Sequence, residues 1–202
     1  MKQIVVIHGG DVFPTYEEYL AYLKNFKIES LDFFRGKKGW KTTLQETLGD
    51  EYEVLLPRMP NGSNAKYLEW KIWFEKLIPF LEDGTILVGH SLGALFLAKY
   101  LAEEIFPKKI TATFLVAAPY DTDGDRPLTE FVLPDSLRRF EEQGGKIFLY
   151  QSTDDPLVQF SELAKYQRAL PHAQVRALEG RGHFLDKDHP IFPELVADIQ
   201  SL

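Results

Sequence analysis

A serine between two glycines stands in a context that suits nucleophilic chemistry. The pentapeptide Gly89-His90-Ser91-Leu92-Gly93 follows the short apolar run 85–88 and precedes residues 94–102, which are rich in helix-forming side chains. A strand, a sharp turn and a helix in that order would lift the hydroxyl of Ser91 clear of the backbone, and the glycines would leave no Cβ where strand and helix pass close together. The same five residues also suit a small turn with a serine helix cap, so the rest of the sequence has to decide between the two.

A serine hydroxyl is a poor nucleophile at neutral pH, and histidine is the base that suits it best. Of the five histidines, His183 is the best candidate because it lies in a glycine-flanked loop directly after the last predicted strand. Its alternative role is that of an ordinary loop histidine. His189 is the second choice as base. His90 has little room to turn back to Ser91 and is predicted to pack behind the turn, and His172 is predicted to lie at the surface.

An acid that could orient the histidine lies in the segment Asp154-Asp155-Pro156, which follows the apolar run 146–150. A carboxylate at the carboxyl end of a strand would hold the histidine tautomer and stabilise the imidazolium. One of the two aspartates is expected to serve only as a turn or cap residue. From the residues themselves, either Asp154 or Asp155 could be the acid.

The segment His8-Gly9-Gly10-Asp11 follows the first apolar run. Its backbone, through Gly10, could donate one N–H to an oxyanion, and Leu92 at the start of the helix could donate the other. A simple turn is the alternative. The chain order is oxyanion loop, Ser91, aspartate and His183, which is the order found in α/β-hydrolases.

Apolar runs alternate with amphipathic segments, which predicts an α/β fold with about six mostly parallel strands and helices on both faces. The expected strands are residues 3–7, 52–56, 85–88, 110–116, 146–150 and 173–178. The expected helices are a capped helix from Thr15 and residues 66–80, 133–143, 157–170 and 193–202. In the helix 66–80, Trp70, Trp73, Phe74 and Leu77 are expected to form one core-facing stripe.

The whole chain, residues 1–202, is expected to be one domain with a long helical excursion at about residues 11–51. Such an excursion is either a lid over a site or a solvated surface segment. It contains the basic patch Arg35-Gly36-Lys37-Lys38-Gly39-Trp40.

The net charge and amino-acid composition argue against several classes of binding partner. A net charge of -7 argues against nucleic acid or an anionic membrane, and no run approaches the roughly 20 apolar residues of a membrane span. Without cysteine there are no disulfides or thiolate sites, and we expect a cytoplasmic protein. The segment 121–125 lacks the spacing of a calcium loop, Gly9-Gly10 lacks the residues of a phosphate-binding loop, and no metal-ligand spacing is found, so no metal is expected.

With these motifs, the chain resembles the α/β-hydrolase superfamily over nearly its full length, and more narrowly the small serine hydrolases related to retinoblastoma-binding protein 9 and bacterial YdeN. The resemblance rests on Val5-Val6-Ile7-His8-Gly9-Gly10, on Gly89-His90-Ser91-Leu92-Gly93, on Ser152-Thr153-Asp154-Asp155-Pro156 and on Gly182-His183-Phe184.

The resemblance implies a three-layer fold without a large cap domain, Ser91 as nucleophile, Asp155 as acid and His183 as base. Asp155 is favoured over Asp154 because superfamily members usually read Asp-x-x-Val here, as in Asp155-Pro156-Leu157-Val158. It also implies esterase-like activity on a small acyl substrate without a cofactor. The long segment 11–51 departs from the small members, and Arg181 stands where a small or polar residue is common.

Two other functions fit the same sequence. A hydrolase-like fold could act mainly as a protein-binding module with weak activity, or the same site could serve a serine peptidase or an acyltransferase. The natural substrate and the oligomeric state do not follow from the sequence.

Overall fold

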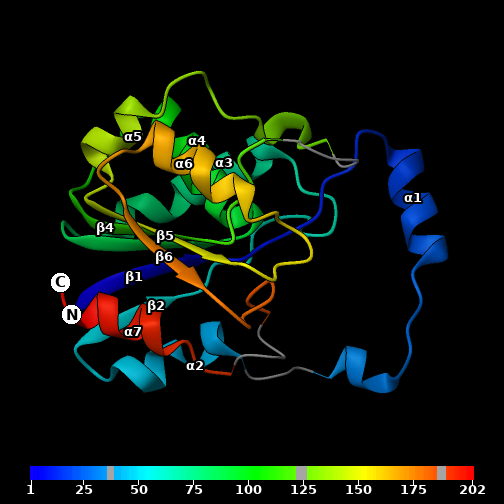
Figure 1. The fold of residues 1–202 in the computed structure, drawn as a ribbon, viewed down its shortest axis with the longest axis horizontal. Coiled ribbons are helices and arrows are strands. Elements are labelled where there is room, and N and C mark those ends of the chain that lie inside the picture. The colour runs from blue at the N-terminus through cyan, green and yellow to red at the C-terminus, as the bar shows by residue number, and fades with distance from the viewer. Residues whose placement is uncertain (36–38, 122–126, 186–189) are drawn as a thin grey trace.

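Six strands form one sheet in a computed structural model that describes residues 1–35, 39–121, 127–185 and 190–202 (Figure 1). The strand order is β2-β1-β3-β4-β5-β6, and every neighbouring pair is parallel. The strands are β1 (Lys2–Ile7), β2 (Tyr52–Leu55), β3 (Thr85–His90), β4 (Ile110–Val116), β5 (Lys146–Ser152) and β6 (Gln174–Leu178). All six expected strands are therefore present, with ends that differ by up to two residues.

Helices cover both faces of the sheet, as expected, so the molecule has three layers (Figure 1). One face carries α3 (Tyr67–Leu77), α4 (Leu92–Glu103), α5 (Arg138–Gln143) and α6 (Ser161–Ala169), and the other carries α2 (Trp40–Leu48) and α7 (Pro193–Gln200). The segments that connect these elements contain the short 3-10 helices η1 (Leu31–Phe34), η2 (Ile78–Phe80) and η3 (Thr129–Phe131).

The apolar strands supply two separate cores because successive side chains point to opposite faces of a sheet. In β1, Val5 and Ile7 pack into the core under α3 and α4, whereas Ile4 and Val6 pack into the core under α2 and α7. All six residues of β3 are buried, as expected for a strand covered on both faces.

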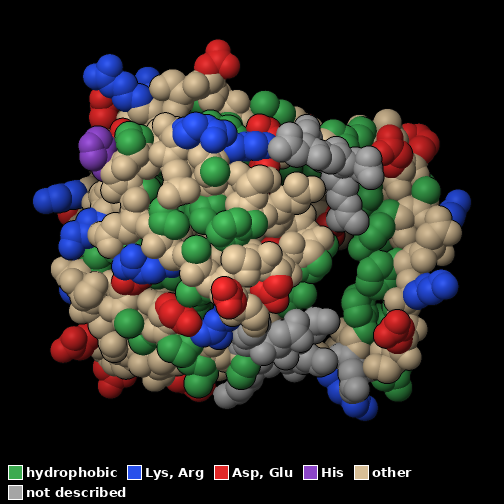
Figure 2. Space-filling view, viewed as in Figure 1, with side chains coloured by type: hydrophobic (Ala, Val, Ile, Leu, Met, Phe, Trp, Pro, Cys, Tyr) green, Lys and Arg blue, Asp and Glu red, His purple; other side chains and the backbone are tan. Residues whose placement is uncertain are grey.

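The helix α1 (Tyr16–Asn25) and η1 lie away from the three layers, and we call residues 13–34 the arm (Figure 1). Thr15 caps α1, as its sequence predicted, by accepting the Glu18 amide at 3.1 Å. None of the residues of α1, all of which the structure describes, is buried. Figure 2 shows apolar side chains along the inner side of the arm, across a hollow from the body.

Three predictions about helices were wrong in detail. The helix expected at 133–143 begins only at Arg138, although Pro134 itself excludes only Leu133 from a helix. The helix expected at 157–170 begins at Ser161, because the carbonyl of Val158 accepts Gln151 Nε2 at 2.9 Å and the amide of Glu162 bonds to Gln159 O instead. Trp73 is 51 % exposed, so it does not belong to the buried stripe.

Candidate active site

Ser91 lies on a sharp turn between β3 and α4. Its φ of 54° and ψ of -123° place a non-glycine residue in the left-handed region, a conformation that costs about 1–3 kcal/mol and persists only when the surroundings enforce it. The Ser91 amide donates to Val116 O at 2.8 Å. A Cβ at Gly89 would lie 2.4 Å from Ala94 Cα, and one at Gly93 would lie 2.4 Å from Ile7 O. Only glycine therefore allows the strand and helix to approach in this way.

His183 bridges Ser91 and an aspartate. Its Nε2 lies 2.9 Å from Ser91 Oγ, and its Nδ1 lies 2.8 and 3.0 Å from the two carboxylate oxygens of Asp155. With the proton on Nδ1 donated to the carboxylate, the Nε2 lone pair faces the hydroxyl. A carboxylate, an imidazole and a hydroxyl that are hydrogen-bonded in this order can activate a serine for attack on an acyl carbon.

The Asp155 carboxylate is buried, and its side chain has no exposed surface. A buried charge is tolerated when hydrogen bonds replace its hydration. Here the amides of Leu157 and Val158 donate at 2.9 and 3.0 Å, and Gln151 Nε2 donates at 3.1 Å. These bonds fix the carboxylate where it meets the imidazole.

Asp154, the other candidate acid, faces away from the imidazole. Its carboxylate accepts the hydroxyl of Ser152 and the amide of Gly182 at 3.2 Å. The hydrogen bond from Ser152 holds the pKa of Asp154 below its ordinary value. The structure thus brings Asp155 to His183 and leaves Asp154 as a support of the loop that carries the histidine.

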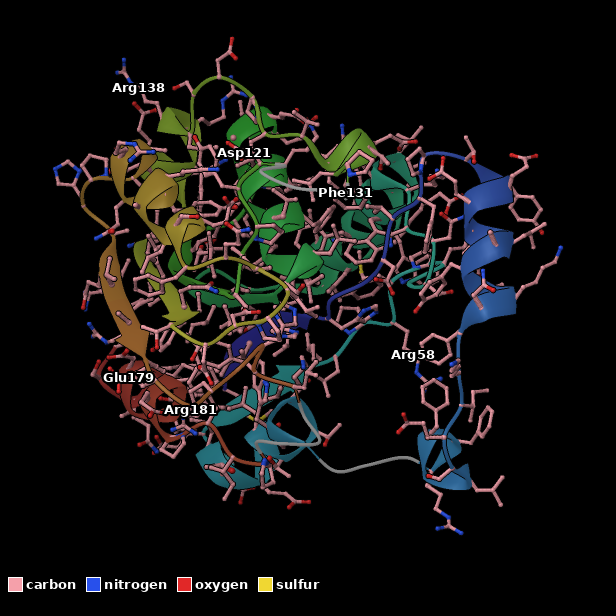
Figure 3. The ribbon with its side chains drawn as sticks, turned by 45° about the vertical axis from the view of Figure 1, so that its right-hand side comes forward. Arg58, Asp121, Phe131, Arg138, Glu179 and Arg181 are labelled. Carbon is pink, nitrogen blue, oxygen red and sulfur yellow. The ribbon has the colours of Figure 1, made fainter. Side chains whose placement is uncertain are left out.

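That loop is a tight turn with three left-handed residues, Gly180, Gly182 and Phe184. Arg181, whose part the sequence did not reveal, forms an ion pair with Glu194 of α7 and donates its amide to Ser152 Oγ at 3.1 Å. Figure 3 shows Arg181 beside α7. The ion pair ties the loop to the rest of the molecule.

His90 is buried behind the turn, as its place in the pentapeptide predicted. Its Nε2 lies 2.8 Å from the carbonyl oxygen of His183, and its ring packs edge-on against Trp40 at 6.0 Å between centroids. Burial lowers the pKa of His90 well below its ordinary value, and the nearby charge of Lys41 acts in the same direction. A neutral His90 therefore donates from Nε2 to the His183 backbone, a contact that no motif predicted.

The glycine-rich segment after β1 lies against the serine turn. A Cβ on Gly9 would lie 3.1 Å from Ser91 Cβ, and one on Gly10 would lie 2.6 Å from Gly62 O. His8 holds the segment, because its Nδ1 lies 2.6 Å from Gly9 O while its Nε2 accepts the Met59 amide at 2.9 Å. No motif in the sequence predicted these contacts of His8.

Gly10 and Leu92 both line the cavity that contains Ser91 and His183. Leu92 is the first residue of α4, so its N–H has no acceptor within the helix. The two expected oxyanion donors thus lie at the same cavity as the serine.

The cavity has a volume of about 590 Å³. Besides Ser91 and His183, the residues that line it include Val158 and three residues of the arm, Phe13, Glu18 and Tyr22. The excursion expected at 11–51 therefore supplies part of the wall through its first half, while α2 in its second half covers the sheet.

The other candidates lie elsewhere. His172 is exposed, its Nδ1 lies 2.9 Å from Glu141 Oε1, and it does not line the cavity. His189, most of the acidic segment 121–125 and the centre of the basic patch lie outside the described residues. Within the ranges that the structure does describe, no three His, Asp or Glu side chains are grouped to hold a metal ion, and no helix could span a membrane.

Comparisons with known proteins agree with this fold. The sequence model of a family described as serine hydrolase matches residues 34–200. No curated protein sequence matches the chain.

Solved structures of similar fold cover nearly the whole chain. The ydeN gene product of B. subtilis has a TM-score of 0.72 at 19% identity, with 100% of this chain and 98% of that chain covered. A putative YdeN-like hydrolase from Pectobacterium atrosepticum has a TM-score of 0.64 at 14% identity, covering 98% and 90%. The methylesterase MES16 from Arabidopsis has a TM-score of 0.61 at 14% identity, covering 100% and 98%. These neighbours show the α/β-hydrolase fold.

Proposed function

This chain belongs to the serine hydrolase family, and we propose that it cleaves an ester, thioester or amide of a small acyl group through an acyl-serine intermediate. The observation that carries the proposal is the 2.9 Å separation of Ser91 Oγ and His183 Nε2 at the wall of a cavity. Solved proteins of this fold include a methylesterase and a thioesterase domain, so oxygen and sulfur esters are the first substrates to test.

In the proposed first half-reaction, Ser91 Oγ attacks the acyl carbon while its proton passes to His183 Nε2. The N–H groups of Gly10 and Leu92 would stabilise the negative charge on the acyl oxygen. His183 then returns the proton to the leaving alcohol, thiol or amine as the bond to the acyl carbon breaks, which leaves the acyl group on Ser91.

In the second half-reaction, His183 takes a proton from water, and the hydroxide attacks the acyl-serine. Collapse of this intermediate breaks the bond to Ser91 Oγ, which regains the proton from His183, and a carboxylic acid leaves. Asp155 stays ionised throughout, because its part is to orient the imidazole and stabilise its protonated form.

A fluorophosphonate probe tests the nucleophile directly, since it forms a stable bond with an activated serine. We expect the intact protein to gain the mass of one label and the Ser91→Ala variant to gain none. Ser161→Ala, which changes an exposed serine at the start of α6, is the control and should label like the unmodified protein. Equal labelling of Ser91→Ala, or no labelling of the unmodified protein, would refute the proposal.

A substrate series then separates the reaction types. Nitrophenyl esters from acetyl to octanoyl, the matching thioesters and the matching anilides are compared by kcat/KM, with and without an added amine acceptor. Hydrolysis of esters in clear excess over anilides supports an esterase. Faster turnover of anilides would indicate a peptidase, and product formation that depends on the amine would indicate an acyltransferase.

A further inference from the structure

Two buried side chains donate hydrogen bonds to consecutive carbonyl groups of the loop that carries His183. His90 Nε2 lies 2.8 Å from the carbonyl oxygen of His183, and Trp40 Nε1 donates to that of Phe184 at 2.9 Å. Both donors are buried, with His90 4% and Trp40 1% exposed. Their rings also pack against each other.

The two donors come from different parts of the fold. His90 is the last residue of β3 and is joined to Ser91 by one peptide bond, whereas Trp40 is the first residue of α2. Thr43, one turn further along α2, donates its hydroxyl to Pro190 O at 2.7 Å, beyond the same loop. The histidine loop is thus held from the serine turn on one side and from α2 on the other.

The loop needs such support because its backbone is strained. Phe184 has a φ of 52°, a conformation that a bulky residue avoids unless its surroundings impose it. Its ring is buried beside Phe192, and its carbonyl is the one that Trp40 binds. Loss of either donor would leave a buried carbonyl without its partner and weaken the support for this conformation.

We propose that His90 and Trp40 form a clamp that positions the base, fixing the His183 backbone relative to Ser91 so that the imidazole stays within reach of the hydroxyl. Neither residue touches the substrate cavity, and both act through His183. The clamp rests on the proposed function, because it supposes that His183 is the base for Ser91. A shift of about 1 Å in a reacting group can cost a hundredfold in rate, so the clamp would affect kcat more than KM.

The test compares variants that lose one donor but keep an aromatic ring, His90→Phe and Trp40→Phe. We expect each to lower kcat for a nitrophenyl ester at least tenfold with KM changed less than twofold. His90→Gln keeps an N–H donor and should recover most of the lost kcat. The combined His90→Phe, Trp40→Phe variant should lose less than the product of the two single effects, because both act on one loop.

Thr113→Val is the matched control. It removes another buried hydrogen bond from a side chain to a carbonyl, the 2.8 Å bond from Thr113 Oγ1 to Gly144 O, which lies away from the cavity walls. It should lower the melting temperature and leave kcat within twofold. If His90→Phe and Trp40→Phe lower kcat no more than Thr113→Val does, or if His90→Gln is no better than His90→Phe, the clamp is refuted.

A second readout does not depend on activity. Trypsin can cleave after Arg181 only when the histidine loop leaves its turn, so the cleavage rate at this bond reports the loop directly. We expect faster cleavage in His90→Phe and Trp40→Phe than in Thr113→Val, and equal rates would refute the clamp. If the loop responds in this way but the unmodified protein takes up no fluorophosphonate, the proposed function fails and the clamp on the loop does not.

Discussion

At the scale of single residues, two neighbouring aspartates have opposite surroundings. Asp155 is buried, bonded to the imidazole and supplied with three further donors, whereas Asp154 is exposed and bonded to Ser152 and Gly182. The amide of asparagine can accept hydrogen bonds as Asp154 does. It cannot stabilise an imidazolium as the carboxylate of Asp155 is proposed to do.

We therefore expect the two asparagine variants to differ sharply. Asp155→Asn should lower kcat for ester hydrolysis by about 10³- to 10⁴-fold, because the imidazole loses the charge that holds its tautomer. Asp154→Asn should lower it by less than about tenfold, through a looser histidine loop. Steady-state rates on one nitrophenyl ester measure both, with melting temperatures as the check on folding. A larger loss in Asp154→Asn would mean that the wrong aspartate has been assigned.

His90 should make the stability of the protein depend on pH. Burial holds its pKa well below the ordinary value of 6.5 and the charge of Lys41 adds to this, so the folded protein keeps His90 neutral. The unfolded chain binds a proton there as pH falls below about 6.5, and the folded chain does not. The neutral His90 therefore contributes its full stabilisation above about pH 6.5. As pH falls below this value, the free energy of unfolding decreases by at most about 1.4 kcal/mol per pH unit.

The measurement is urea unfolding between pH 8 and pH 5, with His90→Gln as the variant that cannot titrate at this position. The unmodified protein should lose more stability across this range than the variant. Identical pH dependence in the two would show that the pKa of His90 is the same in the folded and unfolded states.

At the scale of elements, all six strands and the serine turn could be predicted because their signals are local. Unbroken apolar runs identify buried strands, and Gly89-His90-Ser91-Leu92-Gly93 identifies the turn in which the structure then places Ser91. Helix starts were less predictable. Asp155 accepts the amides of Leu157 and Val158 as a helix cap would, yet α6 begins only at Ser161, because the side chain of Gln151 on β5 takes the carbonyl of Val158.

The arm shows the same limit. The spacing of Tyr16, Tyr19, Leu20 and Leu23 predicted a helix, and α1 is present, but periodicity does not say what the helix packs against. Here it packs against no core. The contacts of His90 and Arg181 with segments more than ten residues away were also beyond prediction, because no short motif encodes them.

Because Tyr22 lines the cavity from an unburied helix, it should affect substrate binding without affecting stability. We expect Tyr22→Ala to raise KM for octanoyl esters about fivefold, which corresponds to about 1 kcal/mol of lost apolar contact, and to leave acetyl esters unchanged. Tyr16→Ala, on the same helix but 63 % exposed and outside the cavity walls, is the control. Equal effects of both variants on KM for octanoyl esters would contradict a role in binding.

At the scale of the whole molecule, the outer helix α7 is joined to the sheet by polar contacts as well as by its apolar face. Arg176 of β6 donates to both carboxylate oxygens of Asp198 at 2.8 Å, and the hydroxyl of Tyr150 on β5 donates to the same carboxylate. Glu194, one turn earlier on α7, binds Arg181 beside the histidine loop. The helix that closes one face of the sheet thus also anchors the loop of the proposed base.

Asp198 should therefore stabilise the whole fold in a manner that depends on pH. Burial raises its pKa, but the hydrogen bonds from Arg176 and Tyr150 outweigh burial and hold the pKa below the ordinary value of 3.8. A carboxylate whose pKa is lower in the folded protein than in the unfolded chain stabilises the fold at pH values above the unfolded pKa, and this stabilisation is lost as pH falls toward the folded pKa.

The side chain of Asp198 is only 16% exposed, so we expect the Asp198→Asn variant to be less stable by about 2 kcal/mol at pH 7, measured by urea unfolding. This difference should shrink below about pH 4. Glu142→Gln, which breaks an exposed ion pair with Arg138, is the control and should leave the free energy of unfolding nearly unchanged. A difference between Asp198→Asn and the unmodified protein that stays constant down to pH 3 would mean that the Asp198 carboxylate is not what holds α7 to the sheet.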